Sequence, residues 1–224
     1  MLRKKPDFSK GNASHPPRRT TVWRSVFILC FAILVLATVS VFVARTCSAE
    51  SVGPNSPSSA SSESGFLDEW SDPANVYSSD NSRAYYGNTG QKKLRAYNFN
   101  FSIPANTTID GFLVQVEGYA LYSGTRNKIN IALSKSSYTV EGNERADLLP
   151  VLVENEAYID LGGSSDKWGG NWSPSDVNNG DFGVLIWDFD TVQDALYIDH
   201  VKVTVYYTST TGRRRRLMAI LGGN

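Results

Sequence analysis

The amino-acid sequence predicts an all-β protein, an antiparallel β-sandwich of jelly-roll type, preceded by a single N-terminal transmembrane helix. Three observations support this fold class. Several stretches of the 224-residue chain alternate apolar and polar residues with the period of two that marks a half-buried strand. Turn-forming Gly, Pro, Asn and Asp separate these stretches, and no stretch after residue 65 repeats its apolar residues at the helical period. One apolar run near the N-terminus is uncharged and long enough to cross a bilayer.

The N-terminal part of the chain predicts a membrane anchor. Residues 1–25 are polar, basic and contain proline, so we expect them to be disordered. Residues 26–44 carry no charge, and at about 1.5 Å per residue a helix of this length matches the ~30 Å hydrocarbon core. The excess of Lys and Arg before this run predicts a cytoplasmic N-terminus and an extracytoplasmic C-terminal domain. The alternative is a signal peptide cleaved after Ala49, which exports the same domain.

Three further segments follow the predicted anchor. Residues 45–65 are rich in Ser and Pro with little apolar content, which predicts a flexible stalk. Residues 66–210 form the predicted β-sandwich domain, and residues 211–224 a disordered basic tail. Acids outnumber bases in the domain, which argues against a nucleic-acid partner because phosphate binding needs a basic surface. Neither Cys30 nor Cys47 lies in the domain, so no disulfide is expected there.

Within the domain, the alternation predicts strands over residues 94–103, 109–122, 128–134 and 197–207, and residues 181–189 are predicted to form a buried strand. Pro150 makes residues 148–153 an edge strand or an irregular segment, because proline cannot donate to a strand ladder. Residues 162–179, rich in Gly, Ser, Asp and Asn, are predicted to be a long loop. The residues predicted to face the core before the last strand are Tyr97, Phe99, Phe101, Ile103, Phe112, Val114, Val116, Ile129, Ile131 and Leu133.

Four sequence pieces carry a family resemblance. They are WSDPANVYSSDNSRAYYG (70–87), YNFNFSIPANTTIDGFLVQVE (97–117), GGSSDKWGGNWSPSDVNNGDFGV (162–184) and IDHVKVTVYYT (198–208). In this order and spacing they resemble a β-sandwich domain found in phage and prophage virion or tail proteins and in exported bacterial surface proteins. The resemblance implies a sandwich over about residues 66–210 and carries over no catalytic residue. A virion part would not normally need the predicted anchor, which favours a cell-surface protein.

The last predicted strand, residues 197–207, places one carboxylate on an apolar face. The alternation puts Tyr197 and Asp199 on the inner side and His200 on the outer side. A buried ionised carboxylate must be hydrogen-bonded or paired with a cation. We therefore predict a structural role for Asp199, which accepts hydrogen bonds from a loop such as residues 173–179 or from an arginine. His200, the only histidine of the domain, is predicted to be a surface residue.

Asp188, Asp190 and Asp194 form an acidic run at a predicted hairpin. Ca²⁺ takes about 6 to 8 oxygen ligands, so these three carboxylates together with backbone carbonyls suffice for a calcium site. The alternative is that they are the outward-facing residues at the end of a strand. No other metal or cofactor is expected.

Trp168 and Trp172 lie in the predicted loop beside glycines and Asp166. Exposed tryptophans next to acids and amides are typical of a sugar-stacking site, so one hypothesis is that both indoles bind a glycan. The alternative is that the rings fold back to cap the open end of the sandwich with their N–H groups hydrogen-bonded.

Together these features predict a membrane-anchored, extracytoplasmic β-sandwich with a structural, adhesive or assembly role. The sequence holds no nucleophile elbow, phosphate-binding loop or paired acids in a convincing motif, so neither a catalytic residue nor an enzyme activity is expected. Two alternatives stay open: a carbohydrate-binding module that uses the loop tryptophans, and a phage-derived virion or tail component. The expected partners are the membrane through residues 26–44 and either a surface glycan or another copy of the chain.

Overall fold

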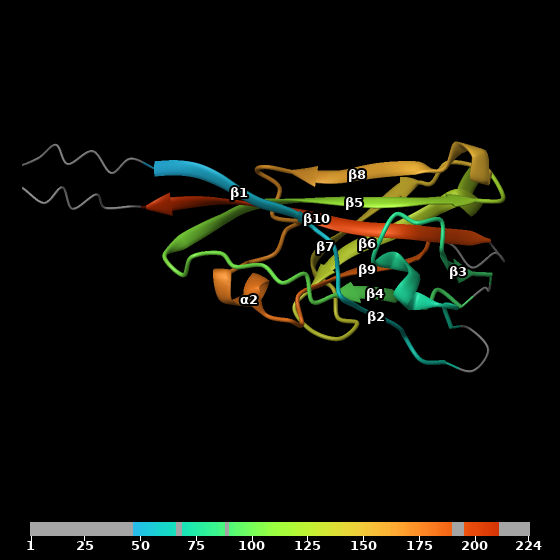
Figure 1. Ribbon diagram of the computed structural model, residues 1–224, viewed down its shortest axis with the longest axis horizontal. Helices are drawn as coiled ribbons and strands as arrows, with labels where there is room; N and C mark the ends of the chain where they lie inside the picture. Colours follow the sequence, from blue (N-terminus) through green and yellow to red (C-terminus); the bar gives the residue numbers. More distant parts are fainter. Residues whose placement is uncertain (1–46, 66–68, 88–89, 190–194, 211–224) are drawn as a thin grey trace, which may run out of the picture. The chain divides into compact units, whose positions relative to one another are not determined.

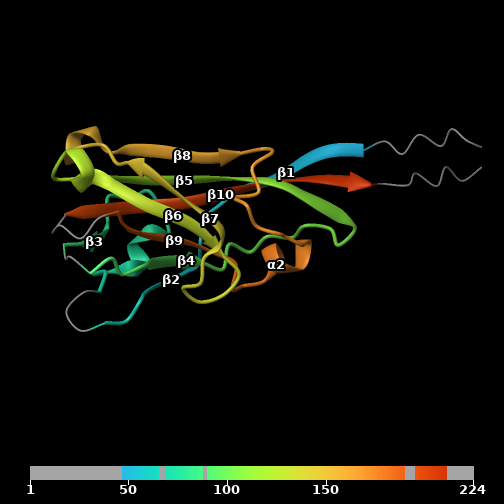
Figure 2. The same cartoon turned by 180° about the vertical axis from the view of Figure 1, so that it is seen from behind.

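A two-sheet β-sandwich makes up the part of the protein that the computed structural model describes, residues 47–65, 69–87, 90–189 and 195–210. The strands are β1 (Cys47–Asn55), β2 (Ser59–Ser62), β3 (Ala84–Tyr86), β4 (Leu94–Tyr97), β5 (Thr107–Ala120), β6 (Lys128–Ser134), β7 (Glu141–Leu148), β8 (Ala157–Gly163), β9 (Gly183–Asp188) and β10 (Leu196–Thr210). Sheet A has the order β1-β10-β5-β8, with β3 also paired to β10, and sheet B has the order β2-β4-β9-β6-β7 (Figures 1 and 2). The predicted all-β sandwich is confirmed for these residues.

The predicted membrane helix, residues 26–44, lies outside the described residues, as do residues 1–25 and 211–224. The chain divides into two units between residues 44 and 45, and every described residue belongs to the second unit. Within that described part, no helix is long and apolar enough to cross a membrane. The anchor and the topology therefore stay predictions.

The predicted stalk, residues 45–65, is instead part of the sandwich from Cys47 onward. β1 pairs antiparallel with β10 in sheet A, and β2 pairs antiparallel with β4 in sheet B. The prediction was wrong because both segments are edge strands, where backbone hydrogen bonds to a single neighbour suffice and little apolar content is required. Val52 and Ala60 nevertheless pack against the core. The sandwich thus begins close after the predicted anchor.

The last strand was predicted over residues 197–207 and runs from Leu196 to Thr210, but its inner and outer faces exchange at a bulge. The pairing of β10 with β5 shifts between Ile198 and His200. A β-bulge adds one residue to one strand, so even-numbered residues of β10 face the core before the bulge and odd-numbered residues face it after the bulge. Ile198 is fully buried in the core, whereas Tyr197, predicted to face inward, lies on the outer face of sheet A.

The strand predicted over residues 94–103 ends at Tyr97. Asn98 (φ 61°) and Asn100 (φ 54°) adopt the left-handed backbone conformation, which asparagine tolerates better than most residues and which interrupts a strand. Leu94 in β4 is buried while Tyr97 is only half-buried, so the inward prediction for Tyr97 is corrected. The predicted inward residues beyond Asn98 are buried: Phe99, Phe101 and Ile103.

An aromatic cluster fills one region of the core between the sheets. The Phe112 ring lies 5.7 Å from Phe182 and 5.1 Å from Trp172, measured between ring centroids. Phe99 and Phe101 pack edge-on against Phe182. Such aromatic pairs add about 0.5–1.5 kcal/mol each beyond the area they bury.

The two irregular segments differ from each other. Of residues 148–153, Leu148 ends β7, residues 149–152 are irregular, as one alternative predicted, and Val153 begins a 3-10 turn, η3 (Val153–Asn155). The predicted loop over residues 162–179 contains one helical turn, α2 (Pro174–Asn178). The Ser173 side chain accepts from the Asp176 N–H and the Asp176 side chain accepts from the Ser173 N–H, a capping box that fixes the start of α2.

Candidate functional site

Trp168 and Trp172, the predicted glycan-stacking pair, are core residues. Trp168 is 0% exposed and Trp172 is 7% exposed. The Trp168 Nε1–H donates to the Phe112 carbonyl at 3.2 Å, and the Trp172 Nε1–H donates to the Lys167 carbonyl at 3.0 Å. Because both rings are enclosed, they offer no face on which a sugar could stack. The hypothesis of a glycan site at these two indoles is wrong, and the folded-back alternative describes their geometry.

The predicted calcium ligands are described only in part. Asp188 is fully buried in β9 rather than outward-facing, and Asp190 and Asp194 lie outside the described residues. Among the residues that the structure describes, no group of three or more His, Cys, Asp or Glu side chains could hold a metal ion. Calcium binding by the full acidic run stays a prediction.

Asp199 sits at the bulge of β10 with 2% of its surface exposed. It accepts hydrogen bonds from the backbone N–H groups of Asp80, at 3.3 Å, and Asn81, at 3.1 Å. The donor loop is therefore the one before β3 and not the predicted 173–179 turn. Burial raises the pKa of the Asp199 carboxyl, and the two N–H groups oppose that shift.

All exposed large hydrophobic side chains of the described residues gather at one end of the sandwich, where β5 ends and β10 begins. We call this end the tip; β1 begins and β10 ends at the other end, where Cys47 pairs with Thr210 (Figure 1). The exposed residues are Tyr85, Leu121, Tyr122, Leu148, Leu152, Val153 and Phe189. Backbone hydrogen bonds join their segments: Leu121 N–H to Ala195 O (3.0 Å), Leu152 N–H to Ala120 O (2.9 Å) and Phe189 N–H to Lys128 O (3.2 Å).

Three tyrosines of the tip form a row across the outer face of sheet A. Tyr197 in β10 is directly opposite Tyr85 in β3 on one side and Tyr119 in β5 on the other. The Tyr197 ring stacks on Tyr119 with centroids 4.6 Å apart and planes 7° apart, and lies 4.9 Å from Tyr85 at 34°. The bulge at Asp199 is what brings Tyr197 into this row, because it turns that side chain outward.

The two ends of the row differ. At one end the Arg83 guanidinium lies 5.3 Å over the Tyr119 ring and is paired with the Glu156 carboxylate. At the other end Tyr85 remains 38% exposed and its hydroxyl lies against Gly87, where an added Cβ would stand 1.9 Å from the hydroxyl oxygen. The row is therefore closed by a cation at Tyr119 and open to solvent at Tyr85.

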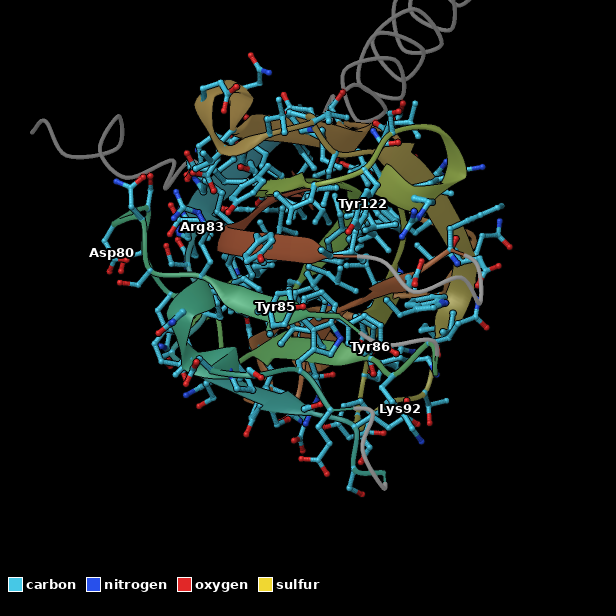
Figure 3. The ribbon with its side chains drawn as sticks, turned by 90° about the vertical axis from the view of Figure 1, so that its right-hand side faces the viewer. Asp80, Arg83, Tyr85, Tyr86, Lys92 and Tyr122 are labelled. Carbon is cyan, nitrogen blue, oxygen red and sulfur yellow. The ribbon has the colours of Figure 1, made fainter. Side chains whose placement is uncertain are left out.

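Tyr122 adds a fourth ring to this region. It is 45% exposed, and the Arg126 guanidinium lies 3.8 Å from its ring centroid. Burial and then the neighbouring Tyr85, Tyr119 and Tyr122 raise the pKa of the Tyr197 hydroxyl. Figure 3 views the tip end-on and shows Arg83, Tyr85 and Tyr122 around the start of β10. We call Tyr85, Tyr119, Tyr122 and Tyr197 the tyrosine cluster.

Polar side chains continue the outer face of sheet A beyond the cluster. In the next row His200, Glu117 and Tyr158 are neighbours in register, and in the row after it the Gln115 amide donates to the Asp160 carboxylate at 2.8 Å. His200, predicted to be a surface residue, is only 9% exposed. Polar side chains thus occupy the row directly beside the aromatic rings.

Sequence reasoning did not find the tyrosine cluster. Its residues come from three segments that are far apart in the sequence: β3, the end of β5 and the start of β10. Tyr85 lies in the segment 70–87, which contributes to the family resemblance but gives no sign of a binding site. Tyr197 is predicted to face inward because the alternation of residues does not reveal the bulge. The excess of tyrosine, 11 in the chain, was the one available signal.

No protein-family model matches the chain, and no curated protein matches it. Among solved structures, one similar chain is titled "Family 16 Carbohydrate Binding Module-2", with 10% identity, coverage of 62% of this chain and 86% of that chain, and a TM-score of 0.35. Another is TmCBM61 in complex with beta-1,4-galactotriose, with 10% identity, coverage of 70% and 87%, and a TM-score of 0.29. Similarity at this level carries no argument about function, and the resemblance to phage and surface proteins stays a prediction.

Proposed function

We propose that the sandwich is an adhesive binding module that recognises carbohydrate through the tyrosine cluster at its tip. One observation carries the proposal: every exposed large hydrophobic side chain among the described residues lies at this end, and the exposed Tyr85 ring there packs against the Tyr197 ring. Exposed apolar groups gathered on one surface indicate an interaction site rather than random placement.

The chemistry of the cluster suits a sugar. A pyranose presents a face of C–H groups and an edge of hydroxyls, and a tyrosine likewise combines a flat apolar ring with a hydroxyl. Tyr85 offers the open end of the row, and Tyr122 supplies a second exposed ring. At the other end of the row the Arg83 guanidinium, paired with the Glu156 carboxylate, adds a cation over the Tyr119 ring.

The position of the cluster also suits an anchored protein. At ~3.3 Å per residue, β10 spans about 43 Å from Tyr197 to Thr210, where β1 begins. We propose that residues 26–44 form the anchor, and along the chain only residues 45 and 46 separate them from β1. Within the sandwich, the tyrosine cluster lies at the opposite end from the start of β1.

A second candidate function, assembly with a protein partner, is favoured by the aliphatic residues of the tip. Leu121 is 41% exposed, Leu152 44% and Val153 49%, and these side chains offer a sugar no hydrogen bond. A protein surface could bury them together. The tyrosine cluster and the aliphatic residues therefore predict different ligands, and variants can separate them.

The test is a glycan array probed with the full chain in detergent and with three variants. Tyr85→Ala and Tyr122→Ala should each lower the affinity for a bound glycan by about tenfold, which corresponds to about 1.4 kcal/mol of lost stacking. Tyr206→Ala is the matched control, because Tyr206 also lies on the outer face of sheet A but in the part of β10 remote from the tip. Leu152→Ser should leave glycan binding unchanged. Absence of any glycan signal, with self-association lost in Leu152→Ser, would replace carbohydrate binding with protein assembly.

A further inference from the structure

A continuous chain of hydrogen bonds crosses the outer face of sheet A next to the tyrosine cluster. The Ser56 Oγ lies 2.8 Å from His200 Nε2, and the Tyr158 hydroxyl lies 2.7 Å from His200 Nδ1. Glu117 is opposite both His200 in β10 and Tyr158 in β8, and burial together with this neighbouring carboxylate raises the pKa of the Tyr158 hydroxyl to about 12. Ser56, His200 and Tyr158 thus form one hydrogen-bonded relay, with the Glu117 carboxylate at its end.

The Glu117 carboxylate favours one arrangement of protons in the relay. A carboxylate only accepts hydrogen bonds, so the single hydroxyl proton of Tyr158 is stabilised on the side of Glu117. His200 Nδ1 must then carry a proton and donate to the Tyr158 oxygen. A neutral imidazole has one protonated nitrogen, so Nε2 is bare and accepts the hydroxyl proton of Ser56.

We propose that Ser56 is an activated nucleophile that accepts an acyl group from a carboxylic ester, with His200 as its general base. The geometry is that of a nucleophile bonded to a base that is held in one tautomer by a third group, and Tyr158 and Glu117 together take the place of that group. This inference goes beyond the proposed binding function and does not depend on it.

Exposure of the two groups fits their roles. Ser56 is exposed in the connection between β1 and β2, so a reagent can reach its hydroxyl, while His200 is only 9% exposed. The charged groups around the imidazole are Lys202 on its own strand, Glu117 on β5, and Asp80 on the loop before β3. Burial and Lys202 lower the pKa of His200, so the imidazole is neutral and able to accept a proton at pH 7.

The reaction balances without any further reagent. The Ser56 O–H bond breaks, its proton moves to His200 Nε2, and Oγ forms a bond to the acyl carbon. The bond between that carbon and the alcohol oxygen breaks, and the imidazolium returns the proton to the departing alkoxide. Water then reverses the sequence: it gives a proton to Nε2, adds to the acyl carbon and releases the Ser56 hydroxyl together with a carboxylic acid.

The test uses the full chain in detergent and a fluorophosphonate probe, with the adduct located by mass spectrometry of peptides. We expect a single adduct on Ser56 that is absent in Ser56→Ala. Ser58→Ala is the matched control, because Ser58 is also exposed but its Oγ donates only to the Asn98 carbonyl, at 2.9 Å. His200→Gln should slow labelling at least about 100-fold, the contribution of a positioned general base.

Tyr158→Phe separates an activating relay from a merely structural one. It removes the acceptor for Nδ1–H while keeping the ring, so labelling should slow and the pH at which it is half-maximal should move. In the wild type the rate should rise with pH to a plateau, with its midpoint below pH 6.5 because the pKa of His200 is lowered. No adduct on Ser56, equal labelling of Ser58, or wild-type rates in folded His200→Gln and Tyr158→Phe would overturn the proposal.

Discussion

Replacing Trp168 with alanine tests whether the WGGNW loop serves the core or a ligand. The indole is fully buried, and its N–H bonds the Phe112 carbonyl. Truncation of a buried tryptophan to alanine costs about 3–5 kcal/mol, out of a total stability of about 5–15 kcal/mol for a domain. At about 2–4 °C per kcal/mol for a domain of this size, the melting temperature should fall by roughly 6–20 °C.

The assay is thermal and urea unfolding followed by far-ultraviolet circular dichroism, with Tyr85→Ala as the control. Tyr85 is partly exposed and loses one ring contact, so its variant should cost only about 1 kcal/mol. Trp168→Ala should thus mainly lower the stability of the protein, and Tyr85→Ala should mainly weaken ligand binding. A Trp168→Ala protein that melts within about 2 °C of the wild type and loses a ligand would refute the core assignment.

Two further predictions concern stability. Burial lowers the pKa of His200 below its ordinary value of 6.5, so the unfolded chain takes up the proton first as the pH falls. The free energy of unfolding, measured by urea titration, should therefore be flat just above pH 6.5 and decline below it. The His200→Gln variant should lack this decline. Deleting residues 47–62 removes β1 and β2 and exposes the edges of β10 and β4, so cooperative unfolding should be lost, whereas a mere stalk could be removed with no change in melting temperature.

The sequence predicted the strands whose residue pattern reports burial directly. β5 and β6 lie where the alternation placed them and β9 where the apolar run placed it, because most of their apolar side chains are buried. Edge strands escaped prediction, since β1 and β2 are held by backbone hydrogen bonds and contain mostly small or polar residues.

The tyrosine cluster could not be predicted from the sequence for a different physical reason. A single bulge at Asp199 exchanges the faces of β10, so Tyr197 moved from the predicted interior to the outer face. The tyrosine row also depends on register between β3, β10 and β5, which no local pattern contains. The tryptophans drew attention because they are clustered in sequence, but their N–H groups bond backbone carbonyls inside the sandwich.

Backbone NMR of the sandwich, titrated with a glycan selected on the array, tests the central claim most directly. The account predicts chemical-shift changes centred on Tyr85, Tyr119, Tyr122 and Tyr197, weaker changes along Glu117 and Tyr158, and none at the end where Cys47 pairs with Thr210. Shift changes centred on the Trp168 loop, or no binding by any glycan, would contradict it.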